Sequence, residues 1–273
     1  MSQDLLYDVT GRVATITLNR PDKRNALNAS LVASCRAALD EAAADDRVRV
    51  VVLAAAGKVF SAGADLAALE AMQTASALDN LADSQRLAEL FARIYLHPKP
   101  VIARVHGHAL AGGCGLAAVC DVAVAAEPAR FGFTEVRIGF VPAIVMVFVR
   151  RKLGEAAARD LLLRGHLIPA REAARIGLIT RCVAEDELDA VVGQTAEEIA
   201  SQTSASAVRL TKQMLAQMPG MGLQEALAYA VQMNAFARGT EDCQAGIAAF
   251  LQDTLPPWRR PEETRGPSGH TAS

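Results

Sequence analysis

The chain has 273 residues, of which 51% are apolar, and a formal net charge of −2 at pH 7. This length fits one large domain or one domain with an appendage, and the apolar fraction is ample for a packed core. Lysine and arginine are spread along the chain, which argues against nucleic-acid binding. The longest apolar run, Phe140 to Val149, is about half of what crosses a bilayer. We therefore expect a protein without a membrane span, in which this run forms a buried helix.

The cysteines and the N-terminus indicate where the protein works. The N-terminus, Met1 to Asp8, carries acids and no long apolar stretch, so we expect no signal peptide. The five cysteines are far apart and include no C-x-x-C pair, which predicts reduced, buried thiols in a cytoplasmic protein. They are Cys35, Cys114, Cys120, Cys182 and Cys243.

Strands and helices alternate in the first part of the chain. Leu5–Val9 and Arg12–Leu18 are predicted as two strands around a turn, because apolar residues alternate with period two from Val13 onward. A helix is predicted from Ser30, as its N-cap, to about Ala44. Val48–Leu53 is rich in β-branched residues, which favours a strand buried on both faces.

Two glycine-rich segments interrupt the middle of the chain. A loop at Gly57 to Gly63 precedes polar helical segments that end near Tyr95, before two prolines. Val101–Val105 is predicted as a buried strand, and Gly107–Gly115 as a glycine-rich turn that leads into a helix. The remaining elements predicted up to residue 183 are a strand at Asp121–Ala126, helices from Pro142, at Glu155–Arg164 and at Ala170–Ile176, and a last strand at Ile179–Val183.

Everything after the last predicted strand is helical in pattern. The predicted helices are Glu185–Ser201, Ala205–Gln217, Leu223–Arg238 and Glu241–Leu251. Strand–helix alternation followed by helices alone predicts an α/β core at residues 1–195 and a C-terminal helical module at residues 196–255. Residues 256–273 are rich in Pro, Gly, Ser and charge, and we expect them to be disordered.

Two glycine-rich turns share a physical theme. In Phe60 to Leu66, small residues precede a helix start, and in His106 to Leu116 a buried strand feeds a glycine turn and then a helix N-terminus. Two such turns facing each other would aim two backbone N–H groups at one point. Preorganised donors of this kind stabilise an enolate oxygen as its charge develops. The alternative is that each turn only packs tightly.

A wider set of motifs resembles the crotonase (enoyl-CoA hydratase/isomerase) superfamily from about residue 5 to residue 255. The motifs are Asn25 to Asn28, Phe60 to Leu66, Gly107 to Cys114, Cys120-Asp121, Phe131-Gly132 with Glu135, Gly139 and Pro142, and Ala170 to Ala173 with Gly177-Leu178. The resemblance implies an α/β spiral of ββα units whose C-terminal helices pack on a neighbour in a homotrimer or hexamer. It also implies an acyl-CoA thioester substrate, with coenzyme A as part of the substrate and no permanently bound cofactor.

The resemblance assigns roles to individual residues. It implies that the two oxyanion N–H groups belong to Ala64 and Gly112. The residues that it implies in coenzyme A binding are Lys23 and Arg24 at the phosphates, Ala26, the backbone of Ala62, Ala64, Asp65 and Leu66 around the adenine and pantetheine, and Phe250 at the nucleotide. Asp253 stands where the family has a lysine shortly after this aromatic, so phosphate contacts from that end are not implied.

The catalytic carboxylates depart from the family pattern. Hydratases of the family use two glutamates, and the second is present as Glu135, whereas Gly115 occupies the position of the first. The segment from Pro142 to Met146 makes the pocket floor apolar, so we expect a raised pKa for Glu135. His108 and Glu89 are nearby candidates for a substitute base.

The function predicted first is that of an enoyl-CoA hydratase, a lyase that adds water to a 2-enoyl-CoA. Two alternatives stay open: an enoyl-CoA delta-isomerase with a single glutamate, and a catalytically weak homologue that binds coenzyme A. The segment from Gly113 to Ala118 fits G-x-G-x-x-A, but a dinucleotide site is disfavoured because Gly113 comes eight positions after Val105. The histidines show no spacing typical of a metal site.

Overall fold

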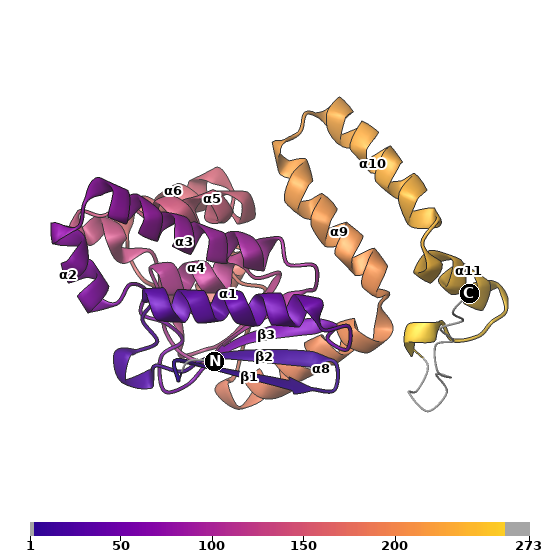
Figure 1. Ribbon diagram of the computed structural model, residues 1–273, viewed down its shortest axis with the longest axis horizontal. Helices are drawn as coiled ribbons and strands as arrows, with labels where there is room; N and C mark the ends of the chain where they lie inside the picture. The colour runs from indigo at the N-terminus through magenta and orange to yellow at the C-terminus, as the bar shows by residue number, and fades with distance from the viewer. Residues whose placement is uncertain (1–2, 260–273) are drawn as a thin grey trace. The chain divides into compact units, whose positions relative to one another are not determined.

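The computed structural model describes residues 3–259 and divides into two compact units, one ending at Ala196 and the other starting at Glu197 (Figure 1). Every described strand lies in the first unit, and the described part of the second unit is helical.

The first unit is built on a mixed sheet of six strands. Their order is β1-β2-β3-β4-β6-β9, with β1 antiparallel to β2 and every other neighbouring pair parallel. The bounds are β1 Leu5–Thr10, β2 Val13–Leu18, β3 Val50–Ala55, β4 Val101–Val105, β6 Val122–Ala126 and β9 Arg181–Val183. All six residues of β3 are buried, which confirms the prediction of a strand covered on both faces.

A second, three-stranded sheet was not predicted from the sequence. It consists of β5 Ala109–Leu110, β7 Arg130–Gly132 and β8 Ile168–Pro169. Strands of two or three residues are too short to show a periodicity, so their pattern is invisible in the sequence. This small sheet nevertheless positions the second glycine turn, because β5 leads directly into it.

Helices pack against the six-stranded sheet. Helices α1 and α3 run side by side across one face (Figure 1). The helical elements that begin in the first unit are η1 Pro21–Lys23, α1 Ala29–Ala44, α2 Leu66–Thr74, α3 Ala77–Tyr95, α4 Gly112–Val119, η2 Thr134–Ile138, α5 Ala143–Lys152, α6 Glu155–Arg164, α7 Ala170–Arg175, η3 Glu185–Glu187 and α8 Leu188–Gln202. The N-cap of α1 is Asn28 and not Ser30, because the Asn28 side chain accepts the N–H of Leu31 at 2.8 Å.

The long apolar run at residues 140–149 is not the buried helix that its composition suggested. Helix α5 buries Val145 and Val149, whereas Met146 and Val147 are 40% and 50% exposed. A run that is apolar all round carries no signal for which face turns inward. The inner face of α5 is therefore set by packing against its neighbours.

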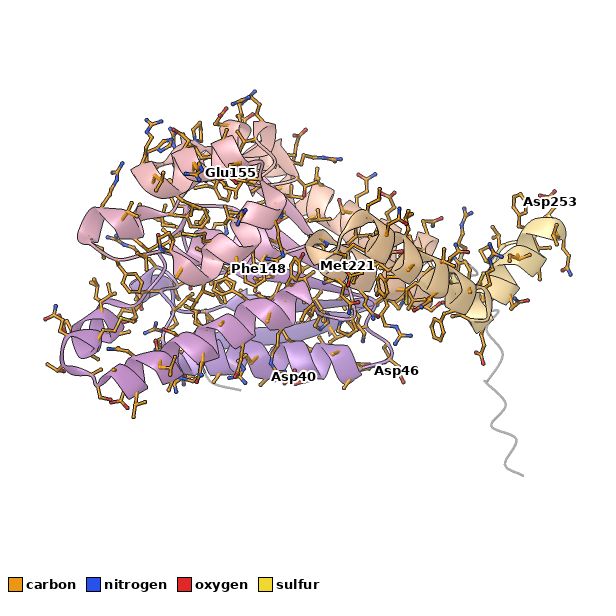
Figure 2. All side chains as sticks on the ribbon, turned by 90° about the horizontal axis from the view of Figure 1, so that it is seen from above. Asp40, Asp46, Phe148, Glu155, Met221 and Asp253 are labelled. Carbon is orange, nitrogen blue, oxygen red and sulfur yellow. The ribbon has the colours of Figure 1, made fainter. Side chains whose placement is uncertain are left out.

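Aromatic rings connect α5 to α3. The ring of Phe148, labelled in Figure 2, lies with its centroid 6.1 Å from that of Phe91 and 5.3 Å from that of Tyr95. Both partners lie on α3. These tilted contacts hold α5 against the helix that forms the opposite wall of the pocket described below.

The described part of the second unit consists of helices. Its bounds are α9 Ala205–Gln217, η4 Met218–Gly220, α10 Leu223–Arg238, α11 Glu241–Leu251 and η5 Pro257–Arg259. The predicted disordered tail starts at residue 256, yet η5 forms there and the Trp258 ring packs against Gly246. The rest of that tail, from residue 260, lies outside the described residues.

The cysteines are free thiols, but not all of them are buried. Cys35, Cys114 and Cys120 are buried, whereas Cys182 and Cys243 are half-buried. Burial raises the pKa of Cys35 to about 12 and also raises the pKa of Cys114. Cys114 therefore acts as a small packing residue and not as a nucleophile. Within residues 3–259, no helix is long and apolar enough to cross a membrane.

Candidate active site

A pocket of about 440 Å³ lies in the first unit and is lined mainly by apolar side chains. The two glycine turns both reach it, through Ala62 and Ala64 in one case and through Ala111 and Gly112 in the other. Glu135, on η2, lines the same pocket. The structure thus brings together the three residues to which the sequence assigned catalytic roles.

The two glycine turns touch each other closely. The N–H of Leu110 donates to the carbonyl of Ser61 at 2.9 Å. A Cβ atom added to Gly63, which has φ +89°, would lie 2.8 Å from the Cβ of Ala111. One added to Gly113 would lie 2.4 Å from the Ser61 carbonyl oxygen. Only glycine at these two positions permits this approach, so the turns are fixed relative to each other.

Two backbone N–H groups at this junction have no acceptor. Among the described residues, the N–H groups of Ala64 and Gly112 make no hydrogen bond. Gly112 is the first residue of α4, where the helix leaves its N–H groups unpaired. Ala111 precedes it with φ 49°, and its own N–H donates to the carbonyl of Gly132 at 2.8 Å. The pocket is therefore lined by two residues whose N–H donors are available to an anionic oxygen.

Glu135 carries a carboxyl group that is poorly solvated. The side chain is half-buried, and its Oε2 atom is buried without a hydrogen-bond partner. Burial raises the pKa of Glu135, and a hydrogen bond from its own backbone N–H offsets part of the shift. The expected rise is confirmed in direction. A carboxyl group of this kind is suited to holding and releasing a proton.

The position of the missing glutamate is filled by neighbouring side chains. A Cβ atom added to Gly115 would lie 2.3 Å from Cγ1 of Val145 and 3.1 Å from the ring of Phe91. Val145 is 4% exposed and lines the pocket. Helix α5 therefore occupies the space into which a longer side chain from α4 would extend. The sequence analysis missed this role of Val145.

The two substitute bases named from the sequence do not line the pocket. His108 is exposed, and Glu89 is 54% exposed and pairs with Arg36 at 2.5 Å. The titratable pocket residues besides Glu135 are Asp83 and Arg86, both on α3. Sequence reasoning missed them because polar residues on a long helix are usually solvated. No group of three or more His, Cys, Asp or Glu side chains within residues 3–259 could hold a metal ion.

Most residues predicted to bind coenzyme A lie outside this pocket. Lys23 and Arg24 are exposed at η1, and Leu66 is 77% exposed at the start of α2. Ala26 is buried, and its carbonyl accepts a hydrogen bond from Arg20 Nη1 at 2.6 Å. The exposed cations face solvent, where a phosphate could reach them, but their part in binding stays a prediction.

The side chain of Asp65 is already engaged within the protein. It pairs with Arg20 at 2.8 Å and accepts the N–H of Ala67 at 2.9 Å, which caps α2. Burial would raise the pKa of Asp65, but the hydrogen bonds from Arg20 and Ala67 outweigh it and lower that pKa. The Asp65 N–H also donates to the Leu27 carbonyl at 3.0 Å, and the Asp65 carbonyl accepts the N–H of Leu69 at 3.0 Å, so a part for Asp65 in coenzyme A binding stays a prediction.

Phe250 lies on α11 in the second unit and is 84% exposed. Its assignment to the nucleotide of coenzyme A stays a prediction.

Comparison with known proteins gives consistent matches along nearly the whole chain. The family model for enoyl-CoA hydratase/isomerase matches residues 8–261. A putative enoyl-CoA hydratase of Thermus thermophilus is 46% identical, over 90% of this chain and 97% of the relative. The 2,3-dehydroadipyl-CoA hydratase of Escherichia coli is 36% identical, over 94% and 98%. The crystal structure of an enoyl-CoA hydratase from Mycobacterium smegmatis superposes with a TM-score of 0.89 at 35% identity, over 95% of this chain and 100% of that one.

Proposed function

The chain belongs to the enoyl-CoA hydratase/isomerase family, and from this premise we propose that it is an enoyl-CoA hydratase in which one carboxyl group, that of Glu135, moves the proton. The observation that carries the proposal is the buried, unpartnered Oε2 of Glu135 in a pocket that is also lined by two residues with unpaired N–H groups. A proton donor and an oxyanion site in one cavity are what enolate chemistry requires.

In this proposal the thioester carbonyl oxygen accepts hydrogen bonds from the N–H groups of Ala64 and Gly112. Addition to the double bond of an enoyl thioester moves negative charge onto that oxygen. Donors that are already in place stabilise the charge without reorganisation, and each is worth about 10²–10³ in rate.

Glu135 would manage both protons of the addition. The water oxygen bonds to the β-carbon while one water proton passes to one oxygen of the Glu135 carboxyl group. The proton on the other oxygen goes to the α-carbon, so the carboxyl group ends as it began. A raised pKa favours this cycle, because it increases the share of the protonated form at a given pH.

A second candidate, enoyl-CoA isomerisation, is favoured by the packing at Gly115. Val145 fills the room in which a second carboxylate would orient water. Isomerisation needs no water: Glu135 takes the α-proton of a 3-enoyl-CoA and returns it to the γ-carbon, which gives the 2-enoyl-CoA. Both candidates use the same enolate site and place coenzyme A in the substrate and not in a resident cofactor.

Mass spectrometry of products formed in isotopically labelled water separates the candidates. We expect each 2-enoyl-CoA substrate to gain the mass of one labelled water molecule, including its labelled oxygen. Conversion of a 3-enoyl-CoA to the 2-enoyl-CoA without oxygen gain would make the protein an isomerase. Glu89→Gln is a matched control, because Glu89 lies outside the pocket lining. Absence of both products, with coenzyme A thioesters still binding, would overturn the enzymatic proposal in favour of a binding protein.

A further inference from the structure

We propose that the pocket accepts an acyl chain with an anionic end, such as a terminal carboxylate, and that Arg86 receives that end together with Ser84. This inference names the substrate class and rests on the proposed acyl-CoA activity.

The charge inside the pocket is the first observation. Arg86 is the one cationic side chain among the described residues that line it. Ser84 lines the pocket as well and offers a hydroxyl donor. Both belong to α3, which also lines the pocket with Asp83 and Leu87, whereas most of the apolar lining comes from other elements. A hydrocarbon chain alone would need neither group.

The position of Arg86 along α3 is the second observation. Toward the C-terminal end of α3, the inner face of the helix lies in the protein core, where Leu90 and Ile94 are at most 2% exposed. One turn earlier Leu87 lines the pocket, and then Asp83, Ser84 and Arg86 do. The face thus changes from apolar to charged along the pocket wall itself. An acyl chain lying along Leu87 toward the N-terminal end of α3 would meet the guanidinium.

The existing partner of Arg86 leaves it able to bind a ligand. Nη2 of Arg86 contacts Oδ1 of Asp83 at 3.2 Å, and the two side chains are 45% and 43% exposed. An exposed i,i+3 pair of this kind is weak. A guanidinium also has five N–H donors and binds a carboxylate through two of them. A substrate carboxylate can therefore share or replace Asp83.

The same pair disfavours a plain hydrocarbon end. A methyl-ended chain that covered Arg86 and Asp83 would remove water from two charges without supplying a hydrogen bond. A carboxylate end would return that bond to Arg86. Asp83 competes for the same guanidinium, so it should weaken the preference for an anionic end. Arg86 and Asp83 therefore act on selectivity in opposite directions.

The test compares two 2-enoyl-CoA substrates of equal chain length, one with a methyl end and one with a carboxylate end. We expect the wild type to have the higher kcat/KM for the carboxylate end. Arg86→Met should reduce that preference on the order of 10-fold to 100-fold, the loss typical of a charge-assisted hydrogen bond. Asp83→Asn should increase the preference.

Arg93→Met is the matched control, because Arg93 lies on the same helix, pairs with Asp40 and does not line the pocket. Arg86→Met and Asp83→Asn break the same ion pair, so a merely structural role would move selectivity in one direction for both. Equal losses on both substrates in Arg86→Met would overturn the inference and point to a contact with coenzyme A. Equal losses in Asp83→Asn would likewise overturn it and point to a role for Asp83 in proton transfer.

Binding separates this inference from the proposed function. If the wild type converts neither substrate, the proposed reaction fails. Calorimetry with the saturated analogues of the two substrates, one with a methyl end and one with a carboxylate end, still decides the inference. Tighter binding of the carboxylate-ended thioester, lost in Arg86→Met, would support it. Equal or weaker binding of that thioester would overturn it.

Discussion

At the scale of single residues, the half-buried carboxyl group of Glu135 connects stability to chemistry. Its raised pKa means that the folded chain binds the proton more tightly than the unfolded chain does. The carboxyl group's contribution to stability is therefore fully present below its pKa in the unfolded chain. It is lost as the pH rises through the higher pKa of the folded state. Above that pKa the protein thus tolerates an unfavourable charge on the carboxyl group that the proposed mechanism uses.

We therefore predict that Glu135→Gln has a higher melting temperature than the wild type at neutral pH. The amide has nearly the same shape and carries no charge, so the desolvation cost disappears. The difference should shrink as the pH falls to the ordinary pKa range of a glutamate. Thermal unfolding at neutral and acidic pH, with Glu89→Gln as an exposed control, measures it. A variant less stable than the wild type at neutral pH would show that the carboxylate is well solvated.

The sequence predicted catalytic roles for Glu135, Ala64 and Gly112 because each lies in a motif that resembles the family, and all three line the pocket. It did not identify Arg86, and although it placed the segment from Pro142 to Met146 at the pocket floor, it missed that Val145 fills the space beside Gly115. Those two reach the pocket only through the way α3 and α5 pack, and packing partners far apart in the chain leave no local pattern. His108 and Glu89 were named for proximity in sequence, which did not become proximity to the pocket.

At the scale of elements, the packing of α4 against α5 fixes what the site can contain. Gly115 on α4 has no side chain, and the side chain of Val145 on α5 fills the space beside it. A glutamate at position 115 alone would collide with Val145, and overpacking of this kind typically costs about 1–3 kcal/mol.

We therefore predict that Gly115→Glu is destabilised and gains no hydration, whereas Gly115→Glu with Val145→Ala recovers stability and raises water addition relative to isomerisation. Urea unfolding and the ratio of the two products measure the two effects. Val145→Ala alone is the control, and it should lose stability by leaving a cavity without changing the product ratio. A stable Gly115→Glu single variant would contradict the packing argument.

Elements with a long periodic pattern were predicted well. Helices α6, α9, α10 and α11 have the bounds that their patterns predicted. The short strands β5, β7 and β8 were missed, and so was the outward face of α5. In each of these cases packing against neighbouring elements decides the structure. The strands are too short to show a periodicity, and the run in α5 is apolar on all sides.

At the scale of the whole molecule, the second unit exposes many large apolar side chains. Large apolar side chains exposed on its helices are Leu215, Leu223, Leu227, Val231, Phe236, Ile247, Phe250 and Leu251. Surface of this kind usually marks an interface. The resemblance to the family implies that the interface joins copies of this chain, and we expect trimers or hexamers.

Light scattering coupled to size exclusion tests this expectation at micromolar concentration. We predict a mass of three or six chains for the wild type and a smaller assembly for Val231→Glu. Gln232→Glu adds the same charge at a neighbouring exposed position of α10 and should leave the mass unchanged if that position lies outside the interface. A clean monomer in the wild type would contradict the prediction.

The central claim is that Glu135 exchanges the proton at the α-carbon of an enolate held by the N–H groups of Ala64 and Gly112. The most direct test is deuterium incorporation at the α-carbon during turnover in heavy water, with wild type and Glu135→Gln compared. We predict that the variant loses α-deuteration and turnover together, by about 10²–10⁴, while its affinity for the coenzyme A thioester changes little. Near-wild-type turnover and α-deuteration in Glu135→Gln would contradict it.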